Sequence, residues 1–251
     1  MPEGDTIFRS ARVLDRALAG RTVTRFESVF PALLRVDDQA PLRGRTIERA
    51  HAIGKHLLIE FSGALTLRTH MRMNGSWHVY RTGERWRRPR SEMRIVIGTD
   101  EWEAVGFMIP VAEFGKPRVV DSLGPDILTA GFDEDEVMRL MREHDDEDIA
   151  DVLLNQRVIA GIGNMWKSES LHAAKVNPFT KVRALTDEDL RRIIKYARRI
   201  MRRSAVEGRQ NHAVYSRGGK LCRTCGAKIA YKKQGPDVRG TYWCPQCQPP
   251  V

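Results

Sequence analysis

The sequence predicts an α+β protein of several domains: an N-terminal β-sandwich with flanking helices, a helical domain and a C-terminal four-cysteine ribbon. Three observations support this prediction. Short β-like stretches separated by turns fill the first half of the chain, amphipathic helical patterns follow, and the four cysteines all occur in the last thirty residues. We expect the domains to cover residues 1–130, 131–215 and 216–251.

The N-terminal domain is expected to begin with a helix from Thr6 to Leu18, because apolar residues recur there at helical spacing. Asp5 or Thr6 can cap its start, and Gly20 suits its end. Seven β-like stretches follow, namely Thr22–Val29, Thr46–Ala52, His56–Phe61, Leu65–His70, Ser76–Tyr80, Met93–Ile97 and Trp102–Val105. Their number and spacing are typical of a sandwich or a barrel-like domain.

The next part of the chain shows helical patterns at Asp133–Glu143, Ile149–Gln156, Asn164–Ala174 and Thr186–Glu207. A tight turn with Gly161 and Gly163 precedes the third of these helices. Glycine lets the backbone approach a phosphate, and with Asn164 as N-cap the first N–H groups of the helix would face outward. Two helices joined in this way could clamp a DNA backbone, although an ordinary helical hairpin fits the pattern equally well.

The cysteines form two CxxC pairs eighteen residues apart, Cys222 with Cys225 and Cys244 with Cys247. This spacing is typical of a zinc ribbon, and the sequence between the pairs reads as a hairpin with strands at Ile229–Tyr231 and Thr241–Trp243. Two disulfides are the alternative. We expect one structural Zn²⁺ per chain, because four thiolates leave no open position for catalysis.

The overall composition indicates a polyanionic partner. The net charge is +10 and the isoelectric point is near 9.8, which favours nucleic acid as the partner. No run of eighteen apolar residues suggests a membrane span. The opening MPEGDT lacks the basic and apolar segments of a secretory signal, so we expect the reducing cytoplasm.

The N-terminus offers a nucleophile. Removal of the initiator methionine would leave the secondary amine of Pro2 beside the carboxylate of Glu3. An α-amino group titrates at roughly pH 7.7–8, so part of it is free to attack an aldehyde-like carbon such as C1′ of a damaged deoxyribose. The neighbouring carboxylate could then move protons. On its own, however, MPE is a common start of a protein chain.

Taken together, these features resemble the family of formamidopyrimidine-DNA glycosylase and endonuclease VIII over nearly the whole chain. The matching motifs appear in family order: the MPEG start, GKHL at 54–57, HMRMNGS at 70–76, LLNQRVIAGIGNMWKSES at 153–170 and RGTYWCPQC at 239–247. The resemblance implies a monomeric, bifunctional glycosylase and AP lyase of base-excision repair, built with a helix–two-turn–helix domain. Its partner would be double-stranded DNA with oxidised bases or abasic sites, in a bacterial cytoplasm.

The resemblance also implies three catalytic residues. Pro2 would form a Schiff base with the sugar, Glu3 would act as acid and base, and Lys55 would contact the flanking phosphates and assist the elimination. Without the family context, Lys55 would be interpreted as a solvated lysine at the start of a strand.

Five further residues match DNA-binding positions of the family. His70 and Asn164 correspond to phosphate contacts, and Arg239 corresponds to the arginine that grips phosphates at the lesion. Met73 matches the residue that enters the base stack when the nucleotide is flipped out, although a lone methionine more commonly packs in a core. Phe114 is a retained void filler, whereas the arginine that accompanies it in formamidopyrimidine glycosylases is missing.

The opening residues 4–6 and the ending TYWCPQCQ are similar to the endonuclease VIII branch, which implies oxidised pyrimidines as lesions. A formamidopyrimidine and 8-oxoguanine glycosylase is the first alternative, and a catalytically silent protein that binds damaged DNA is the second. The segment RTGERWRRPR at 81–90 could follow a DNA backbone with Trp86 stacked on a base. A solvated hairpin loop is the other interpretation.

Overall fold

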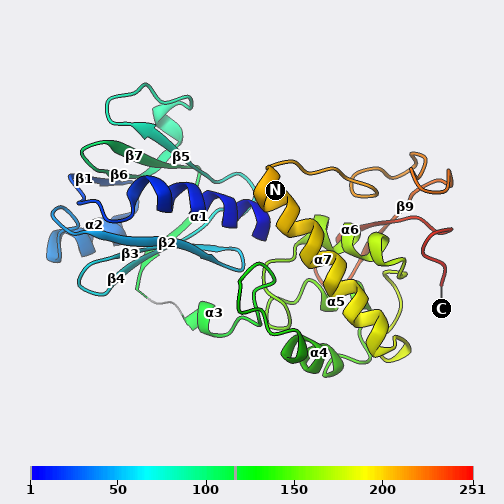
Figure 1. Cartoon of the computed structure of the whole chain (residues 1–251). Coiled ribbons are helices and arrows are strands. Elements are labelled where there is room, and N and C mark those ends of the chain that lie inside the picture. Colours follow the sequence, from blue (N-terminus) through cyan, green and yellow to red (C-terminus); the bar gives the residue numbers. More distant parts are fainter. Residues whose placement is uncertain (1, 116–117, 251) are drawn as a thin grey trace. The chain divides into compact units, whose positions relative to one another are not determined.

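The computed structural model of the chain describes residues 2–115 and 118–250. The described residues form two compact units (Figure 1). The first unit comprises Pro2 and residues from Thr6 to Asp121, and the second comprises Glu3–Asp5 and the chain from Ser122 onward. The expected boundary between a helical domain and the cysteine ribbon, near residue 215, stays a prediction.

The first unit is a sandwich of two four-stranded antiparallel sheets. One sheet has the order β1-β6-β7-β5 and the other β2-β3-β4-β8. The strands are β1 (Arg25–Ser28), β2 (Ile47–Ile53), β3 (His56–Phe61), β4 (Leu65–His70), β5 (Ser76–Arg81), β6 (Met93–Gly98), β7 (Trp102–Phe107) and β8 (Val111–Phe114). The predicted β-sandwich is therefore confirmed, and all seven predicted strands are present.

The larger of two hydrophobic clusters in the first unit joins both sheets to α1 (Gly4–Leu18). Ile7 and Leu14 of α1 are almost fully buried in it, together with Ile59 of β3 and Ile97 of β6. The helix buries one face because its apolar residues return every three or four positions. It begins at Gly4, earlier than expected, so Asp5 and Thr6 lie in its first turn and do not cap it.

Four short elements of the first unit were not expected from the sequence: α2 (Pro31–Gln39), the 3₁₀ turn η1 (Arg90–Glu92), β8 and α3 (Arg118–Asp121). The helix α2 begins with Pro31, and Leu33 is its one fully buried residue. Strand β8 has only four residues and pairs with β4 alone at the edge of the sheet.

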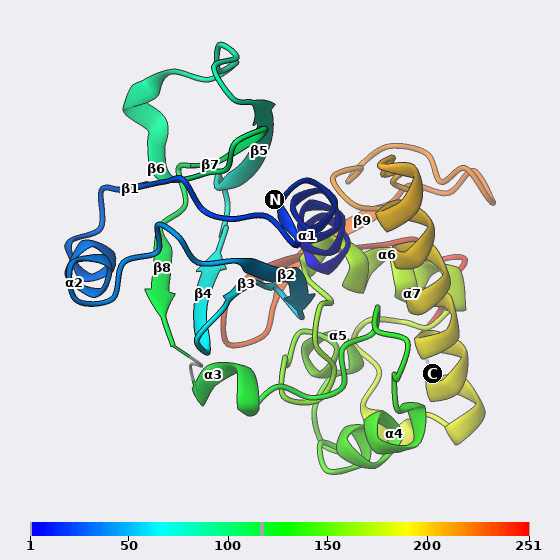
Figure 2. The ribbon, with the colours of Figure 1, turned by 60° about the vertical axis from the view of Figure 1, so that its left-hand side comes forward.

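The second unit is helical, with a β-hairpin near its end. Its elements are α4 (Glu134–Arg142), α5 (Ile149–Val152), α6 (Asn164–Ala174), η2 (Val182–Ala184), α7 (Asp187–Glu207), β9 (Ala230–Gln234) and β10 (Arg239–Trp243). Figure 2 shows α7 beside α6, with which it packs. Thr186 and Asp189 form a capping box at the start of α7, as the predicted N-cap requires. The second predicted helix was too long, because α5 ends at Val152 rather than at Gln156.

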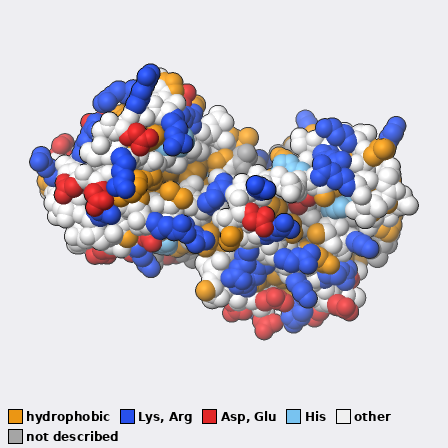
Figure 3. All heavy atoms as spheres, turned by 45° about the horizontal axis from the view of Figure 1, so that its top comes forward, with side chains coloured by type: hydrophobic (Ala, Val, Ile, Leu, Met, Phe, Trp, Pro, Cys, Tyr) orange, Lys and Arg blue, Asp and Glu red, His pale blue; other side chains and the backbone are white. Residues whose placement is uncertain are grey.

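The hairpin pairs β9 and β10 in antiparallel register from Arg239 opposite Gln234 to Trp243 opposite Ala230. This confirms the strands and the turn that were expected between the cysteine pairs. Among the described helices, none combines the length and apolarity needed to cross a membrane. Figure 3 shows lysine and arginine side chains over much of the face that it presents, consistent with the net charge of +10.

Candidate active site

The carboxylate of Glu3 lies at the first turn of α6. It accepts hydrogen bonds from the backbone N–H groups of Gly163 (3.1 Å), Met165 (2.8 Å) and Trp166 (3.2 Å), and Glu3 is only 1% exposed. An acidic group is favoured there because the orphan N–H groups and the helix dipole both stabilise negative charge. Glycine is required at 163, since a Cβ there would lie 2.3 Å from Glu3 Cδ.

This arrangement corrects one expectation from the sequence. The N-cap of α6 is Gly163, not Asn164, and the first-turn N–H groups bind Glu3 of the same chain. The outward-facing phosphate cradle predicted at this helix start is therefore wrong. The glycine turn instead receives the N-terminal segment, because Gly4 N also donates to Gly161 O at 3.0 Å.

Asp5 fixes the same segment from the other side. This carboxylate is fully buried and accepts from Trp166 Nε1 (2.8 Å), Ser204 Oγ (2.7 Å) and Gln210 Nε2 (2.9 Å). Residues 3–5 are thus held by α6 and α7 through both carboxylates. Pro2 is bonded to this fixed segment and is half-buried. Sequence reasoning did not identify Asp5 as a site residue, because its three partners are at least 160 positions away in the chain.

In the first unit, Lys55 lies in the turn between β2 and β3, next to a polar cluster. The rings of His56 and His70 meet edge to face, with centroids 5.0 Å apart. Nη1 of Arg68 lies 2.8 Å from Nδ1 of His56. Nη2 of the same arginine forms an ion pair with Oε1 of Glu113 at 2.7 Å. Burial lowers the pKa of His56 to about 3 and that of His70 to about 4, and the nearby cations add to the effect. Both imidazoles are therefore neutral at physiological pH.

The neutral state of His70 decides what it can bind. Its Nδ1 accepts a hydrogen bond from Arg72 N at 3.1 Å. A neutral imidazole with Nδ1 as acceptor carries its proton on Nε2. His70 can therefore offer an N–H donor, which suits its predicted contact with a phosphate oxygen.

Met73 and Phe114 lie in contrasting environments. Met73 is in the turn before β5 and is 60% exposed, so it does not pack in the sheet core. Phe114 ends β8, pairs with Leu67, and its ring lies 6.0 Å from that of Phe26 against the hydrophobic core. Of the two expected void fillers, Met73 is the more exposed, and the role of both stays a prediction.

The hairpin is fixed to α6 next to Arg239. Asn164 Nδ2 donates to Gly240 O at 2.9 Å, and Lys167 Nζ donates to Thr241 Oγ1 at 2.7 Å. Arg239 itself is exposed, with one contact of 3.4 Å to Asp237. Asn164 therefore positions β10 in this structure, and its contact with a phosphate stays a prediction.

Lys167 was not expected as a site residue. It is 1% exposed, and burial lowers its pKa to about 8, although Asp151 and Glu3 oppose the shift. A lysine on the buried face of a helix is unusual unless it is paired. No signal in the sequence marks it, because its partner Thr241 lies on the distant hairpin.

The four cysteines come together as expected. Their sulfur atoms all lie within 4.8 Å of one another, with Cys225 and Cys244 Sγ at 3.4 Å and Cys222 and Cys247 Sγ at 3.9 Å. Sulfur ligands of a tetrahedral Zn²⁺ are roughly 3.8 Å apart, given bonds of about 2.3 Å. The donor set therefore fits a metal ion of this kind.

Comparison with known proteins identifies the class. Residues 1–108 match the profile of the formamidopyrimidine-DNA glycosylase N-terminal domain, and residues 123–215 match that of the formamidopyrimidine-DNA glycosylase H2TH domain. The crystal structure of Lactococcus lactis Fpg with abasic-site DNA superimposes with a TM-score of 0.85 at 22% identity, covering 98% of this chain and 99% of that one.

Two relatives are more similar in sequence. "Probable endonuclease 8 2" of Streptomyces coelicolor is 36% identical over 99% of this chain and 94% of its own length. "DNA-(apurinic or apyrimidinic site) lyase Nei2" of Mycolicibacterium smegmatis is 32% identical over 99% of both chains.

The chain belongs to the family of formamidopyrimidine-DNA glycosylase and endonuclease VIII. Within that family it falls in the endonuclease VIII branch. The predicted family, fold and enzyme class, a DNA glycosylase and AP lyase, are thereby confirmed.

Proposed function

We propose that the protein removes oxidised pyrimidines from double-stranded DNA and cleaves the resulting abasic site, with Pro2 as nucleophile. The anchoring of Glu3 carries this proposal. Three backbone N–H groups hold its carboxylate at the start of α6, so the adjacent Pro2 is attached to a fixed point. A chain terminus is ordinarily mobile, and a nucleophile must be held close to its target to react efficiently.

The chemistry follows from the secondary amine that Pro2 presents once Met1 is removed. Its nitrogen attacks C1′ of the damaged nucleotide, and the bond from C1′ to the base breaks, so that the base leaves with the electron pair and takes up a proton. Opening of the sugar ring at O4′ gives an iminium between Pro2 and C1′. Glu3 exchanges protons in these steps.

Two eliminations then cut the strand. Loss of a proton from C2′ expels the 3′ phosphate, and a second elimination expels the 5′ phosphate, which leaves a one-nucleotide gap with phosphates at both ends. Lys55 assists these steps, and its position beside the neutral His70 supports a shared role in holding the flanking phosphates.

Met73 and Arg239 both contact the DNA. Met73 fills the space of the flipped nucleotide, and its 60% exposure supports this role. Arg239 binds phosphates through its guanidinium fork, and the two hydrogen bonds between α6 and β10 support its positioning. The four cysteines hold one structural Zn²⁺, which stiffens the hairpin and takes no part in the chemistry. We expect the protein to act as a monomer in the bacterial cytoplasm.

Borohydride trapping on abasic-site DNA tests the proposal. Reduction of the iminium links the protein covalently to the DNA, so the wild-type protein is expected to trap and a Pro2→Gly variant to trap far less. Absence of a trapped product with wild-type protein on every abasic or oxidised substrate would show that it is a silent DNA-binding protein.

The choice of lesion needs a separate measurement. The endonuclease VIII branch of the family supports oxidised pyrimidines. Single-turnover cleavage of duplexes with thymine glycol, 5-hydroxycytosine, dihydrouracil or 8-oxoguanine, each opposite every normal base, gives the order of preference. Faster cleavage of 8-oxoguanine than of every pyrimidine lesion would favour the alternative of an 8-oxoguanine glycosylase.

A further inference from the structure

The arginine-rich segment Arg81–Arg90 is folded onto the sandwich. The backbone N–H of Arg87 donates to the hydroxyl of Tyr80, which is 1% exposed. Trp86 Nε1 donates to Glu103 Oε1 at 2.5 Å, and Glu103 is 6% exposed. A buried hydroxyl and a buried carboxylate therefore hold the segment, while most of its side chains stay exposed to solvent.

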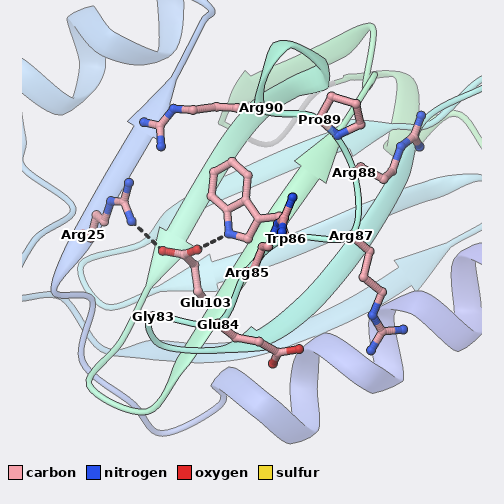
Figure 4. A pocket seen from close by; sticks show the side chains of 10 residues that line it. All are labelled: Arg25, Gly83, Glu84, Arg85, Trp86, Arg87, Arg88, Pro89, Arg90 and Glu103. Atoms are coloured by element: carbon pink, nitrogen blue, oxygen red, sulfur yellow. Dashed lines mark hydrogen bonds and ion pairs between the residues drawn. The ribbon is translucent and has the colours of Figure 1, made fainter.

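Trp86 supports this segment through contacts with the sandwich. Its ring meets Phe107 edge to face at 5.8 Å, and the guanidinium of Arg90 lies 5.5 Å from its centroid. Its one donor is used by Glu103 (Figure 4). The stacking of Trp86 on a base, which the sequence suggested, stays a prediction.

The segment lines a cavity of about 600 Å³ together with Arg25 and Glu103 (Figure 4). Five arginines and two glutamates line it, a formal excess of three positive charges. The volume lies within the range of ligand sites, and the charge selects an anion.

Two of the arginines are available to such a ligand. Three already have carboxylate partners: Arg25 with Glu27 and Glu103, Arg88 with Glu92, and Arg90 with Glu27. For the side chains of Arg85 and Arg87, the described part of the chain provides no hydrogen bond or ion pair, and both are exposed. Each guanidinium offers five N–H donors in a fork that matches phosphate oxygens.

Arg88, near the C-terminal end of the segment, lies beside the turn that carries Met73. Arg88 Nη1 donates to Ser76 Oγ at 3.0 Å, and Ser76 is the first residue of β5. The turn directly before it is closed by the hydrogen bond from Gly75 N to Met71 O at 2.9 Å. DNA that receives Met73 between its bases would therefore pass close to this end of the segment.

We propose that Arg85 and Arg87 form a second contact with the DNA backbone, on phosphates near the position where Met73 enters the stack. The ligand is duplex DNA, so the inference rests on the proposed function. It adds a binding surface on the outer face of the β1-β6-β7-β5 sheet. None of the DNA-binding residues proposed above lies on that face.

The test is the salt dependence of equilibrium binding to a duplex with a tetrahydrofuran abasic analogue. Each phosphate contact contributes about 0.9 to the slope of log K against log salt concentration, so an Arg85→Gln, Arg87→Gln double variant should lower the slope by about 1.8. Binding at low salt should weaken about tenfold or more. Because the described residues offer neither side chain a hydrogen-bond or ion-pair partner, we expect the variant to retain its structure.

The matched control is Arg35→Gln with Arg43→Gln, which removes the same charge from exposed positions in and after α2. A slope change in the Arg85, Arg87 variant no larger than in this control would overturn the proposal. Binding to this DNA needs no catalysis, so failure here is distinct from failure of borohydride trapping.

Single methylphosphonate substitutions along each strand locate the contact. Neutral linkages at one or two positions near the abasic analogue should weaken binding of the wild-type protein and leave the double variant unaffected. If every position weakens both proteins equally, Arg85 and Arg87 do not bind phosphates.

Discussion

A methyl group added at Gly163 should slow the enzyme by displacing the carboxylate of Glu3, although no predicted catalytic residue is itself substituted. A Cβ at this position would lie 2.3 Å from Glu3 Cδ and 2.5 Å from Glu3 Oε1. Ordinary contact begins at 3.4 Å, so the carboxylate of Glu3 must move by the difference, 1.1 Å. Hydrogen bonds of 2.8–3.2 Å to three backbone N–H groups do not survive such a shift together.

The magnitude follows from those contacts. Hydrogen bonds to a charged group contribute about 1.5–3 kcal/mol each, so the loss of one or two in Gly163→Ala lowers the free energy of unfolding by about 1.5–6 kcal/mol. A displacement of about 1 Å next to the nucleophile costs on the order of 10²-fold in rate. We therefore expect both a lower stability and a slower formation of the iminium.

The assay is single-turnover cleavage of abasic-site DNA at saturating enzyme, together with urea unfolding. Gly131→Ala is the matched control, because a Cβ there meets nothing within 4 Å. If Gly163→Ala cleaves as fast as Gly131→Ala, then the fixed position of Glu3 does not control the nucleophile, and the reasoning fails.

Three further outcomes are expected. Met73→Ala should weaken binding to an abasic duplex about tenfold while changing stability by no more than about 0.5 kcal/mol, since the side chain is 60% exposed; equal affinity would remove Met73 from the interface. Cys244→Ser should lower zinc, measured by mass spectrometry, from one ion per chain and abolish DNA binding, because β10 would lose its support; full binding without metal would contradict this. The folded pKa values of His56 and His70, about 3 and about 4, lie below the ordinary value, so the unfolded chain takes up protons first and stability should fall as the pH drops from about 6.5 to 4. Urea midpoints measured at several pH values check this, and a His70→Asn variant should show a shallower decline.

The regular parts of the fold could be predicted because local periodicity determines them. Strands β3 and β4 occupy the predicted ranges, and α6 and the capped α7 do so as well. Apolar periodicity and capping residues do not predict the end of an element where tertiary contacts determine it. The helix α5 ends at Val152, and the side chain of Gln156 holds the following loop. Its Nε2 donates to Leu154 O and Ile162 O, and its Oε1 accepts from Gly161 N.

The site was predictable in its residue types and not in its contacts. The motifs pointed to Pro2 and Glu3, but not to the binding of Glu3 by the first turn of α6, which lies 160 residues away. The contact of Arg68 with His56 and Glu113 depends on the register of β4 between β3 and β8, which the sequence does not reveal. Lys167 was not predicted because its partner, Thr241, lies on a strand that is distant in the sequence.

Mass spectrometry of the trapped product tests the central claim most directly. After borohydride reduction on abasic-site DNA, nuclease and protease digestion should yield an N-terminal peptide that lacks Met1 and carries the sugar remnant on the nitrogen of Pro2. A remnant on the side chain of Lys55 or of another lysine, with an unmodified Pro2, would contradict the account.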